Sequence, residues 1–289
     1  QKLSLDMDED LDFDLDLGGL SIPKGITVTY DSDNKVPLGT VRVDGMLDWA
    51  TDQDTTMLVE TIVSSMGSQI EIGSMHDKAI GANFTAEIIF RDTKLTDSEQ
   101  LDHGLVAMGH VDIMGAEKES HLVLKGGAKA GATSITVEGD ASGWKVGDTI
   151  LLVGTSRQGE DSNGSLITQD EERVITAING NKITFKEALK YTHEAPAGYD
   201  LETYVGNLSR NVVFSSENPE GTRGHVMLMN DMVDHGEFAN SVMFAEFQDL
   251  GRTVFTEAND SDNPLGRYSL HLHQIGTGND APYTMIMGN

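Results

Sequence analysis

The stretch Leu265-Gly-Arg-Tyr-Ser-Leu-His-Leu-His-Gln-Ile-Gly276 sets two histidines in strict alternation with two leucines. Successive side chains of an extended strand point to opposite faces. Leu270 and Leu272 therefore point one way, and His271 and His273 point the other. The leucine face predicts burial in a core. The histidine face predicts an outward polar edge that can bind a metal ion or move a proton.

A related stretch lies just upstream, Val242-Met-Phe-Ala-Glu-Phe-Gln-Asp-Leu-Gly251, and it aligns with the first at an offset of 25 residues. The alignment sets Glu246 on His271 and Gln248 on His273. Repeats of roughly 20 to 30 residues, each with short alternating strands, are typical of a stacked β-solenoid. The alignment therefore predicts that these side chains stack on adjacent coils.

A third segment, Gly224-His-Val-Met-Leu-Met-Asn230, lies about one more such step upstream in a looser register. It adds His225 to the expected outward patch. The many short strands with glycine turns between Gly25 and Asp92 extend the same pattern towards the N-terminus, and they predict stacked β-coils or a small sandwich. The opening segment, residues 3–17, alternates apolar and acidic residues. It predicts a solvated acidic face, with a bound cation as the alternative.

Composition supports an all-β chain in a salt-rich environment. The sequence has 31 glycines, 6% aromatic residues and no long helical periodicity. Its net charge of −27 argues against a nucleic-acid partner, because phosphate would be repelled. The absence of cysteine excludes a disulfide framework, so we expect divalent cations, calcium first, to stiffen the fold.

No transmembrane run or signal peptide is seen in the sequence, so we expect no membrane insertion within this segment. The chain begins at Gln1 without a methionine and ends at Asn289 where another coil would follow. We therefore expect a trimmed piece of a longer protein. Asn-x-Ser/Thr sequons occur at Asn83, Asn163 and Asn207, and also at Asn259, and they are the basis for expecting a glycoprotein.

Four hairpin-like strands between about Gly131 and His193 differ from the rest of the chain. Asn179-Gly180 between the last two is a strong two-residue turn signal. We predict an inserted β-barrel or sandwich over residues 126–200. Residues 1–125 then hold the first coils, and residues 201–289 hold further coils that are truncated at the C-terminus.

Several motifs in one order resemble a known family. They are Gly39-Thr-Val-Arg-Val-Asp-Gly-Met-Leu-Asp48, Gly67-Ser-Gln-Ile-Glu-Ile-Gly73, Trp144-Lys-Val-Gly-Asp-Thr-Ile150, Leu189-Lys-Tyr-Thr-His193, Leu208-Ser-Arg-Asn-Val-Val213, Gly224-His-Val-Met227 and Leu265 to His273. This string is similar to the eight-glycine domain and the region after it in cell-surface hyaluronidases, cell-migration-inducing hyaluronan-binding proteins and fibrocystin-like proteins.

The resemblance implies an extracellular eight-glycine domain that leads into a right-handed parallel β-helix. It also implies hyaluronan cleavage with calcium dependence in one branch and no known enzymatic activity in the other. This chain departs from the vertebrate members in its lack of cysteine, its acidity and its early end. A strongly acidic protein needs cations or a local basic patch to meet a polyanion.

The histidine patch is the first candidate site. His225, His271 and His273 can hold a divalent ion, either calcium or a transition metal such as zinc, with Glu246 as a neighbour. Alternatively, Glu246, His271 and His273 serve as acid and base in glycan cleavage. The third alternative is a structural polar ladder.

Three arginines form the second candidate group: Arg210, Arg252 and Arg267. They can bind a sugar carboxylate bidentately, or they can pair with the abundant Asp and Glu. Acidic residues between coils (Asp231, Asp234 and Glu237, with His235) predict a solvated loop, with a calcium site as the alternative. Trp49 and Trp144 are expected in cores rather than as sugar platforms.

Together these features predict an extracellular glycan-binding or glycan-cleaving module, hyaluronidase-like, whose partner is an acidic polysaccharide such as hyaluronan or another uronate glycan. The alternative is a non-catalytic structural, matrix or adhesion protein of the cell surface, because fold alone does not determine function. Self-association is left open.

Overall fold

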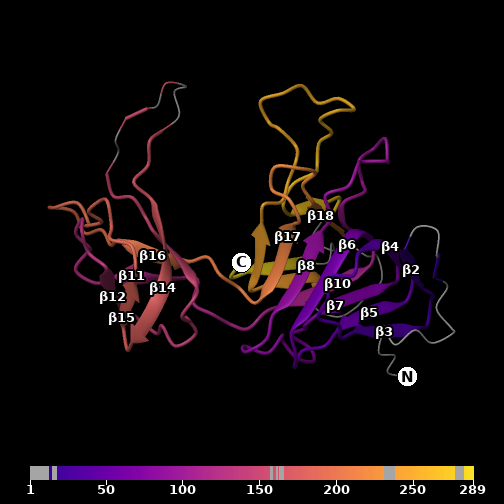
Figure 1. Ribbon diagram of the computed structural model, residues 1–289, viewed down its shortest axis with the longest axis horizontal. Coiled ribbons are helices and arrows are strands. Elements are labelled where there is room, and N and C mark those ends of the chain that lie inside the picture. Colours follow the sequence, from indigo (N-terminus) through magenta and orange to yellow (C-terminus); the bar gives the residue numbers. More distant parts are fainter. Residues whose placement is uncertain are drawn as a thin grey trace. The chain divides into compact units, whose positions relative to one another are not determined.

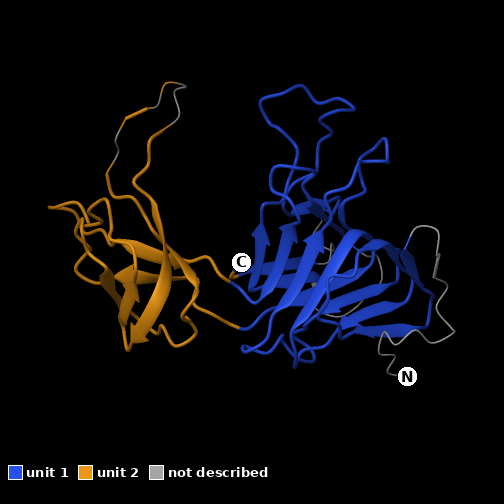
Figure 2. Ribbon diagram, in the orientation of Figure 1, with its two compact units in different colours: residues 1–116, 210–287, 289 blue, residues 117–209, 288 orange. Residues whose placement is uncertain are grey.

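The computed structural model describes residues 13–14, 18–156, 159–160, 162, 166–230, 238–276 and 283–289. Within these ranges there are β-strands and no α-helix, which confirms the all-β prediction. No described segment forms a helix that is long and apolar enough to cross a membrane. The chain divides into two compact units, one of residues 1–116 and 210–287 and the other of residues 117–209 (Figure 2).

The first unit is a solenoid of two parallel sheets. Each of the opening coils gives one strand to the first sheet and the next strand to the second, as Figure 1 shows. The opening coils supply β2 (Gly19–Ile22), β3 (Thr27–Tyr30), β4 (Leu38–Val43), β5 (Met46–Trp49), β6 (Thr55–Ser64) and β7 (Gln69–Ile72). In the first sheet β2, β4 and β6 pair in parallel, and in the second β3, β5 and β7 do so.

The first sheet forks after β6. The N-terminal half of β6 pairs with β8 (Ala86–Phe90), and its C-terminal half pairs with β9 (Gly104–Ala107). The later coils repeat this division, each with a loop between its half-strands: β17 (Val212–Ser216) with β18 (His225–Met229), and β20 (Ala245–Gln248) with β21 (His271–His273). The second sheet continues through β10 (His110–Met114), β19 (Phe238–Met243) and β22 (Tyr283–Met287).

Aliphatic side chains from both sheets fill the solenoid core, and Trp49 lies among them. Glycines stand where one coil meets the next. A Cβ on Gly45 would lie 2.3 Å from the carbonyl oxygens of Pro23 and Ile26. Gly73 has a φ of 71°, and a Cβ there would lie 2.4 Å from the Met114 carbonyl oxygen. The high glycine content therefore reflects close backbone approach as well as turns.

The alternation predicted for the Leu265–Gly276 stretch is confirmed, but the 25-residue register is wrong. Leu270 and Leu272 pack against the core. Across the sheet, however, His271 pairs with Met227, while Glu246 in β20 pairs with Val213. β20 and β21 are therefore two halves of one coil. The similar sequences of the two half-strands made one interrupted coil look like two.

The N-terminal acidic segment falls largely outside the described residues. Its described part, β1 (Phe13–Asp14), pairs antiparallel with β2.

The second unit, residues 117–209, is a closed antiparallel barrel, one of the two alternatives that the sequence predicted for residues 126–200. Its strands are β11 (His121–Leu124), β12 (Ser134–Glu138), β13 (Thr149–Leu152), β14 (Glu171–Asn179), β15 (Lys182–Phe185) and β16 (Tyr204–Asn207), in the order β11-β12-β15-β14-β13-β16. The predicted hairpin joins β14 to β15. Because Asn179 pairs with Lys182, its loop residues are Gly180 and Asn181. Trp144 lies in the core of this barrel.

Candidate functional site

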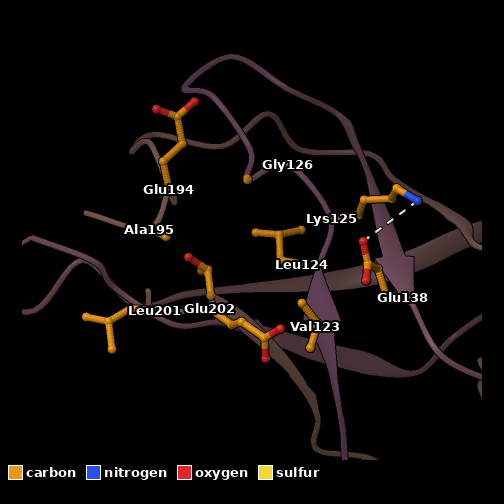
Figure 3. A pocket seen from close by; sticks show the side chains of 11 residues that line it. Val123, Leu124, Lys125, Gly126, Glu138, Glu194, Ala195, Leu201 and Glu202 are labelled. Carbon is orange, nitrogen blue, oxygen red and sulfur yellow. Dashed lines mark ion pairs between the residues drawn. The ribbon is translucent and has the colours of Figure 1, made fainter. Parts of the chain in front are cut away.

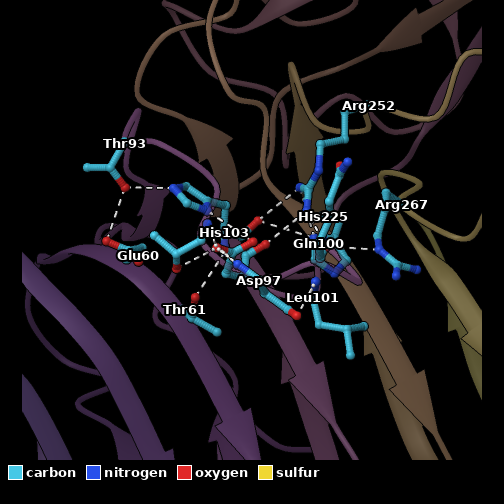
Figure 4. Close-up of polar contacts among 12 residues, drawn as sticks. Glu60, Thr61, Thr93, Asp97, Gln100, Leu101, His103, His225, Arg252 and Arg267 are labelled. Atoms are coloured by element: carbon cyan, nitrogen blue, oxygen red, sulfur yellow. Dashed lines mark hydrogen bonds and ion pairs between the residues drawn. The ribbon is translucent and has the colours of Figure 1, made fainter. Parts of the chain in front are cut away.

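Three loops above the fork of the first sheet are tied together by two arginines, the half-buried Arg252 and the buried Arg267. Arg252, from the loop between β20 and β21, donates to the Asp102 carbonyl at 2.9 Å and the Arg223 carbonyl at 2.7 Å, and also to the Gln100 carbonyl (Figure 4). Arg267 donates through Nε to the same Gln100 carbonyl at 2.9 Å. We call the region around Asp102, His103, His225, Arg252 and Arg267 the polar junction.

His225 lies fully buried inside the polar junction, so the prediction that it lies on an outward patch is wrong, because the loops above the fork cover it. Its Nδ1 lies 3.1 Å from Arg252 Nη1 (Figure 4) and 3.2 Å from the His103 carbonyl oxygen, and each tautomer of the neutral ring makes one of these two hydrogen bonds. Burial, and then the charges of Arg252 and Arg267, lower the pKa of His225 to about 3, so the ring is neutral. The ring lies over Gly104, where an added Cβ would come within 2.6 Å of Nδ1.

Unpartnered polar atoms concentrate at the polar junction. Among the described residues, seven buried side-chain nitrogen or oxygen atoms lack a hydrogen-bond partner. Four of these belong to the junction: Asp102 Oδ1, His103 Nδ1, His225 Nε2 and Arg252 Nε. Such atoms are costly to bury, and they are usually satisfied by water, an ion or a ligand. This concentration makes the junction the candidate functional site.

A groove of about 540 Å³ opens beside the polar junction on the outer face of the first sheet. Apolar side chains, among them Val106, Met227 and Met229, line part of it. Arg267 and His273 add polar groups. The remaining lining residues are Thr40, Thr61, Val63, Asp97, Leu101, Asp102 and Met108.

Four rings form a continuous row that ends at this groove. Phe255 stacks on Tyr268 with ring centroids 5.4 Å apart. Tyr268 contacts His271 at 5.2 Å, and His271 contacts His273 at 5.1 Å. Phe255 is 80% exposed at the outer end of the row, and His273 lines the groove at the inner end. The alternation pattern predicted that His271 and His273 share one face, but no pattern predicted that Phe255 and Tyr268 extend this row.

The structure brings only some of the sequence-predicted site residues together. His271 and His273 are neighbours, and His271 Nδ1 donates to the Gly266 carbonyl at 2.8 Å. Glu246 lies elsewhere. Followed across the paired strands of the sheet, Glu246 is level with Thr56 of β6, whereas His271 is level with Val63 of the same strand. Glu246 and His271 are therefore roughly 20 Å apart along the strand direction. The predicted pairing of Glu246 with His271 as acid and base is therefore wrong.

The three predicted arginines all have protein partners. The backbone N–H of Arg210 donates to Glu246 Oε2 at 2.9 Å, so this arginine lies beside Glu246. Arg252 and Arg267 bind main-chain carbonyls, an outcome that neither alternative from the sequence included. The acidic loop residues Asp231, Asp234, His235 and Glu237 lie outside the described residues.

The barrel contains a second hollow, of about 420 Å³ (Figure 3). Its charged lining residues are Lys125, Glu138, Glu194 and Glu202. Lys125 lies 3.7 Å from Glu138, so the single cation is already paired. The remaining carboxylates make this hollow unsuitable for an anionic ligand.

The fold and the junction together define a parallel β-helix with an inserted barrel and loops gathered on one face. Residues 19–125 match the G8 domain family, so the chain contains a G8 domain, and the predicted resemblance is confirmed. In the structure this match runs through the first coils of the solenoid and into the first strand of the barrel.

Relatives extend the match beyond that domain. A G8 domain-containing protein of Dictyostelium discoideum is 30% identical over 213 residues, which cover 69% of this chain and 13% of that protein. The human cell migration-inducing and hyaluronan-binding protein is 25% identical over 150 residues, which cover 50% of this chain and 10% of that protein. The chain thus spans only a small part of these relatives.

Among solved structures, the gp54 tailspike of Acinetobacter baumannii bacteriophage AP22, solved in complex with a capsular saccharide, aligns at a TM-score of 0.26 with 11% identity. The alignment covers 77% of this chain and 35% of the tailspike.

Proposed function

We propose that the solenoid unit binds an acidic polysaccharide of the uronate-containing class, outside the cell or at its surface. The observation that carries this proposal is the aromatic row that ends in the groove. Sugar rings present apolar C–H faces that stack on aromatic rings, and their hydroxyl groups need hydrogen-bond partners. The aromatic row supplies rings for stacking, and the polar groups of the groove supply hydrogen-bond partners.

Arg267 gives the groove a cationic group in a chain of net charge −27. Asp97 and Asp102 line the same groove, but both carboxylates already accept hydrogen bonds from backbone N–H groups of their own loop. Three of its five N–H hydrogens are used, through Nε to Gln100, Nη1 to Leu265 and Nη2 to Glu99, all at main-chain carbonyls. Two hydrogens remain for a sugar carboxylate or hydroxyl. Burial lowers the pKa of neighbouring Arg252 to about 10, so it too is protonated at neutral pH. The human relative's name, hyaluronan-binding, agrees with this ligand class.

The proposal is for binding rather than cleavage, because the predicted acid–base pair is not assembled. The test is a calorimetric titration with hyaluronan oligosaccharides, with a neutral glucan as the control ligand. We expect binding of the anionic ligand alone. We expect Phe255→Ala and His273→Ala each to weaken it about 5- to 10-fold, the effect of one aromatic contact. Tyr199→Ala removes an aromatic side chain that is 73% exposed on the barrel, and it should have no effect.

Equal affinity of the Phe255→Ala and wild-type proteins would contradict the proposed site. Absence of binding to any uronate glycan, with or without calcium, would favour a structural or adhesion role instead. Analysis of ligand length in the same samples detects cleavage, and shortened chains would show that the module is also catalytic.

A further inference from the structure

Three side chains of metal-ligand type meet beside the polar junction. Glu60 projects from β6 at the fork, and Asp102 and His103 end the loop that leads into β9. One ligand atom from each lies within 4.8 Å of the other two. His103 is fully buried. None of these residues was singled out by the sequence patterns.

The hydrogen bonds fix where the protons are. Thr93 Oγ1 lies 3.0 Å from Glu60 Oε2 and 2.6 Å from His103 Nε2 (Figure 4). A carboxylate only accepts, so the single hydroxyl hydrogen of Thr93 goes to Glu60. The hydroxyl oxygen must then accept from His103 Nε2–H. Nε2 is thus occupied by Thr93, and Nδ1 is the ring nitrogen left for a second partner.

That second nitrogen faces the carboxylate of Asp102. His103 Nδ1 lies 3.5 Å from Asp102 Oδ1, and both atoms are buried without a hydrogen-bond partner. The other oxygen of Asp102 accepts from the backbone N–H groups of Thr96 at 2.7 Å and Asp97 at 3.2 Å, which fixes the carboxylate in this orientation. Either a proton on Nδ1 or a metal ion between the two atoms satisfies both of them.

The separation fits two ligands of one tetrahedral metal ion. Bonds of about 2.0–2.2 Å at a tetrahedral angle place two ligand atoms about 3.4 Å apart. We propose that Glu60, Asp102 and His103 bind a divalent transition metal of the zinc class, with a further position open to water. Calcium prefers six to eight oxygen ligands, so an imidazole with two carboxylates suits it poorly.

The surrounding contacts orient the ligands as outer partners do in metal sites. Thr93 holds both His103 and Glu60, and the Asp97 turn holds Asp102. The same loop lines the groove through Asp97, Leu101 and Asp102. A bound ion would therefore stabilise this wall of the groove, whatever the groove binds.

The test is titration of chelator-treated protein with ZnCl₂, CoCl₂ and CaCl₂, followed by calorimetry, melting temperature and the visible absorption of Co(II). We expect one site for zinc and for cobalt, a rise in melting temperature, and no competition from calcium. Asp102→Asn and Glu60→Gln should each weaken zinc binding at least about 100-fold.

Asp102→Asn is designed to keep the fold. Its amide oxygen can accept from Thr96 and Asp97, while its N–H₂ supplies a donor to His103 Nδ1. His271→Ala and His273→Ala are the matched controls, and they should bind zinc like the wild type. Failure of the wild type to bind zinc or cobalt at micromolar concentrations would overturn the proposal. So would undiminished binding by folded Asp102→Asn, or loss of binding in the His271 and His273 variants alone.

Discussion

The barrel and the solenoid differ in how completely their buried polar groups are hydrogen-bonded. In the barrel, Glu171 accepts from the N–H groups of Lys190 and Tyr191, from His193 Nε2 at 3.1 Å and from Arg173. In the solenoid, the polar junction leaves four buried atoms unpartnered, whereas within the described barrel residues only Thr203 Oγ1 is left so. A buried hydrogen-bond network in which every polar group is paired stabilises a fold, while unpaired groups in such a network are available to a ligand. The comparison assigns structure to the barrel centre and function to the junction.

The two tryptophans make the comparison measurable, because one lies in each core. Trp49→Phe leaves Trp144 as the fluorescent reporter of the barrel. Trp144→Phe leaves Trp49 as the reporter of the solenoid. Each of the following variants is measured in the matching background by urea unfolding.

The largest effect is expected for Glu171→Ala. It leaves Arg173 and His193 without their carboxylate in a buried site, which should lower the free energy of barrel unfolding by about 3–5 kcal/mol. Glu172→Ala, an exposed neighbour on the same strand, should change it little. Equal losses in the two variants would show that the Glu171 centre is not what holds the barrel.

The same carboxylate predicts acid sensitivity of the barrel. Burial alone would raise its pKa, but hydrogen bonds from Lys190, Tyr191, His193 and Arg173 lower the pKa of Glu171 to about 2. A lowered folded-state pKa means that its stabilisation is present above about pH 4.5 and is lost as the pH falls towards 2. The Trp144 signal should therefore show lower stability at pH 3 than at pH 5. Glu171→Gln should flatten this dependence, and an unchanged slope would contradict the assignment.

Gly104→Ala should produce the next largest effect, in the solenoid. The new methyl group would lie 2.3 Å from the His225 carbonyl oxygen and 2.6 Å from its ring, so the strand pair must shift, at about 1–3 kcal/mol. Gly206→Ala is the control, because its nearest neighbour would be 3.8 Å away. We expect a loss in the Trp49 signal for Gly104→Ala alone. No loss there would mean that His225 is not packed against β9 as described.

The smallest effect is a gain in stability. Asp48, Glu71 and Asp112 are register neighbours across three strands of the second sheet. Burial, then Asp112 and Asp48, raise the pKa of Glu71. A raised folded-state pKa means that its contribution is present at low pH and lost as the pH rises. Glu71→Gln should therefore stabilise the solenoid at pH 7 by about 0.2–1 kcal/mol. Destabilisation at pH 7 would show that the charge is paired.

The sequence predicted those features of the fold that depend on local patterns of residues. Alternation placed Leu270 and Leu272 on the core face, and hairpin signals located β12 to β15 of the barrel, because both depend on neighbours in the chain. The strands that close the barrel, β11 and β16, were not predicted. It did not predict the fork after β6, since nothing local shows that β20 and β21 belong to one coil. The proposed metal ligands were missed for the same reason. Glu60 and Asp102 are distant in the sequence, and only the pairing of β6 with β9 brings them together.

The most direct test of the central claim is hydrogen–deuterium exchange of the intact protein with and without a uronate oligosaccharide. The account predicts slower exchange in β18, in β21 and in the loop of residues 249–270, and no change across residues 117–209. Protection confined to the barrel, around Lys125 and Glu202, would contradict it.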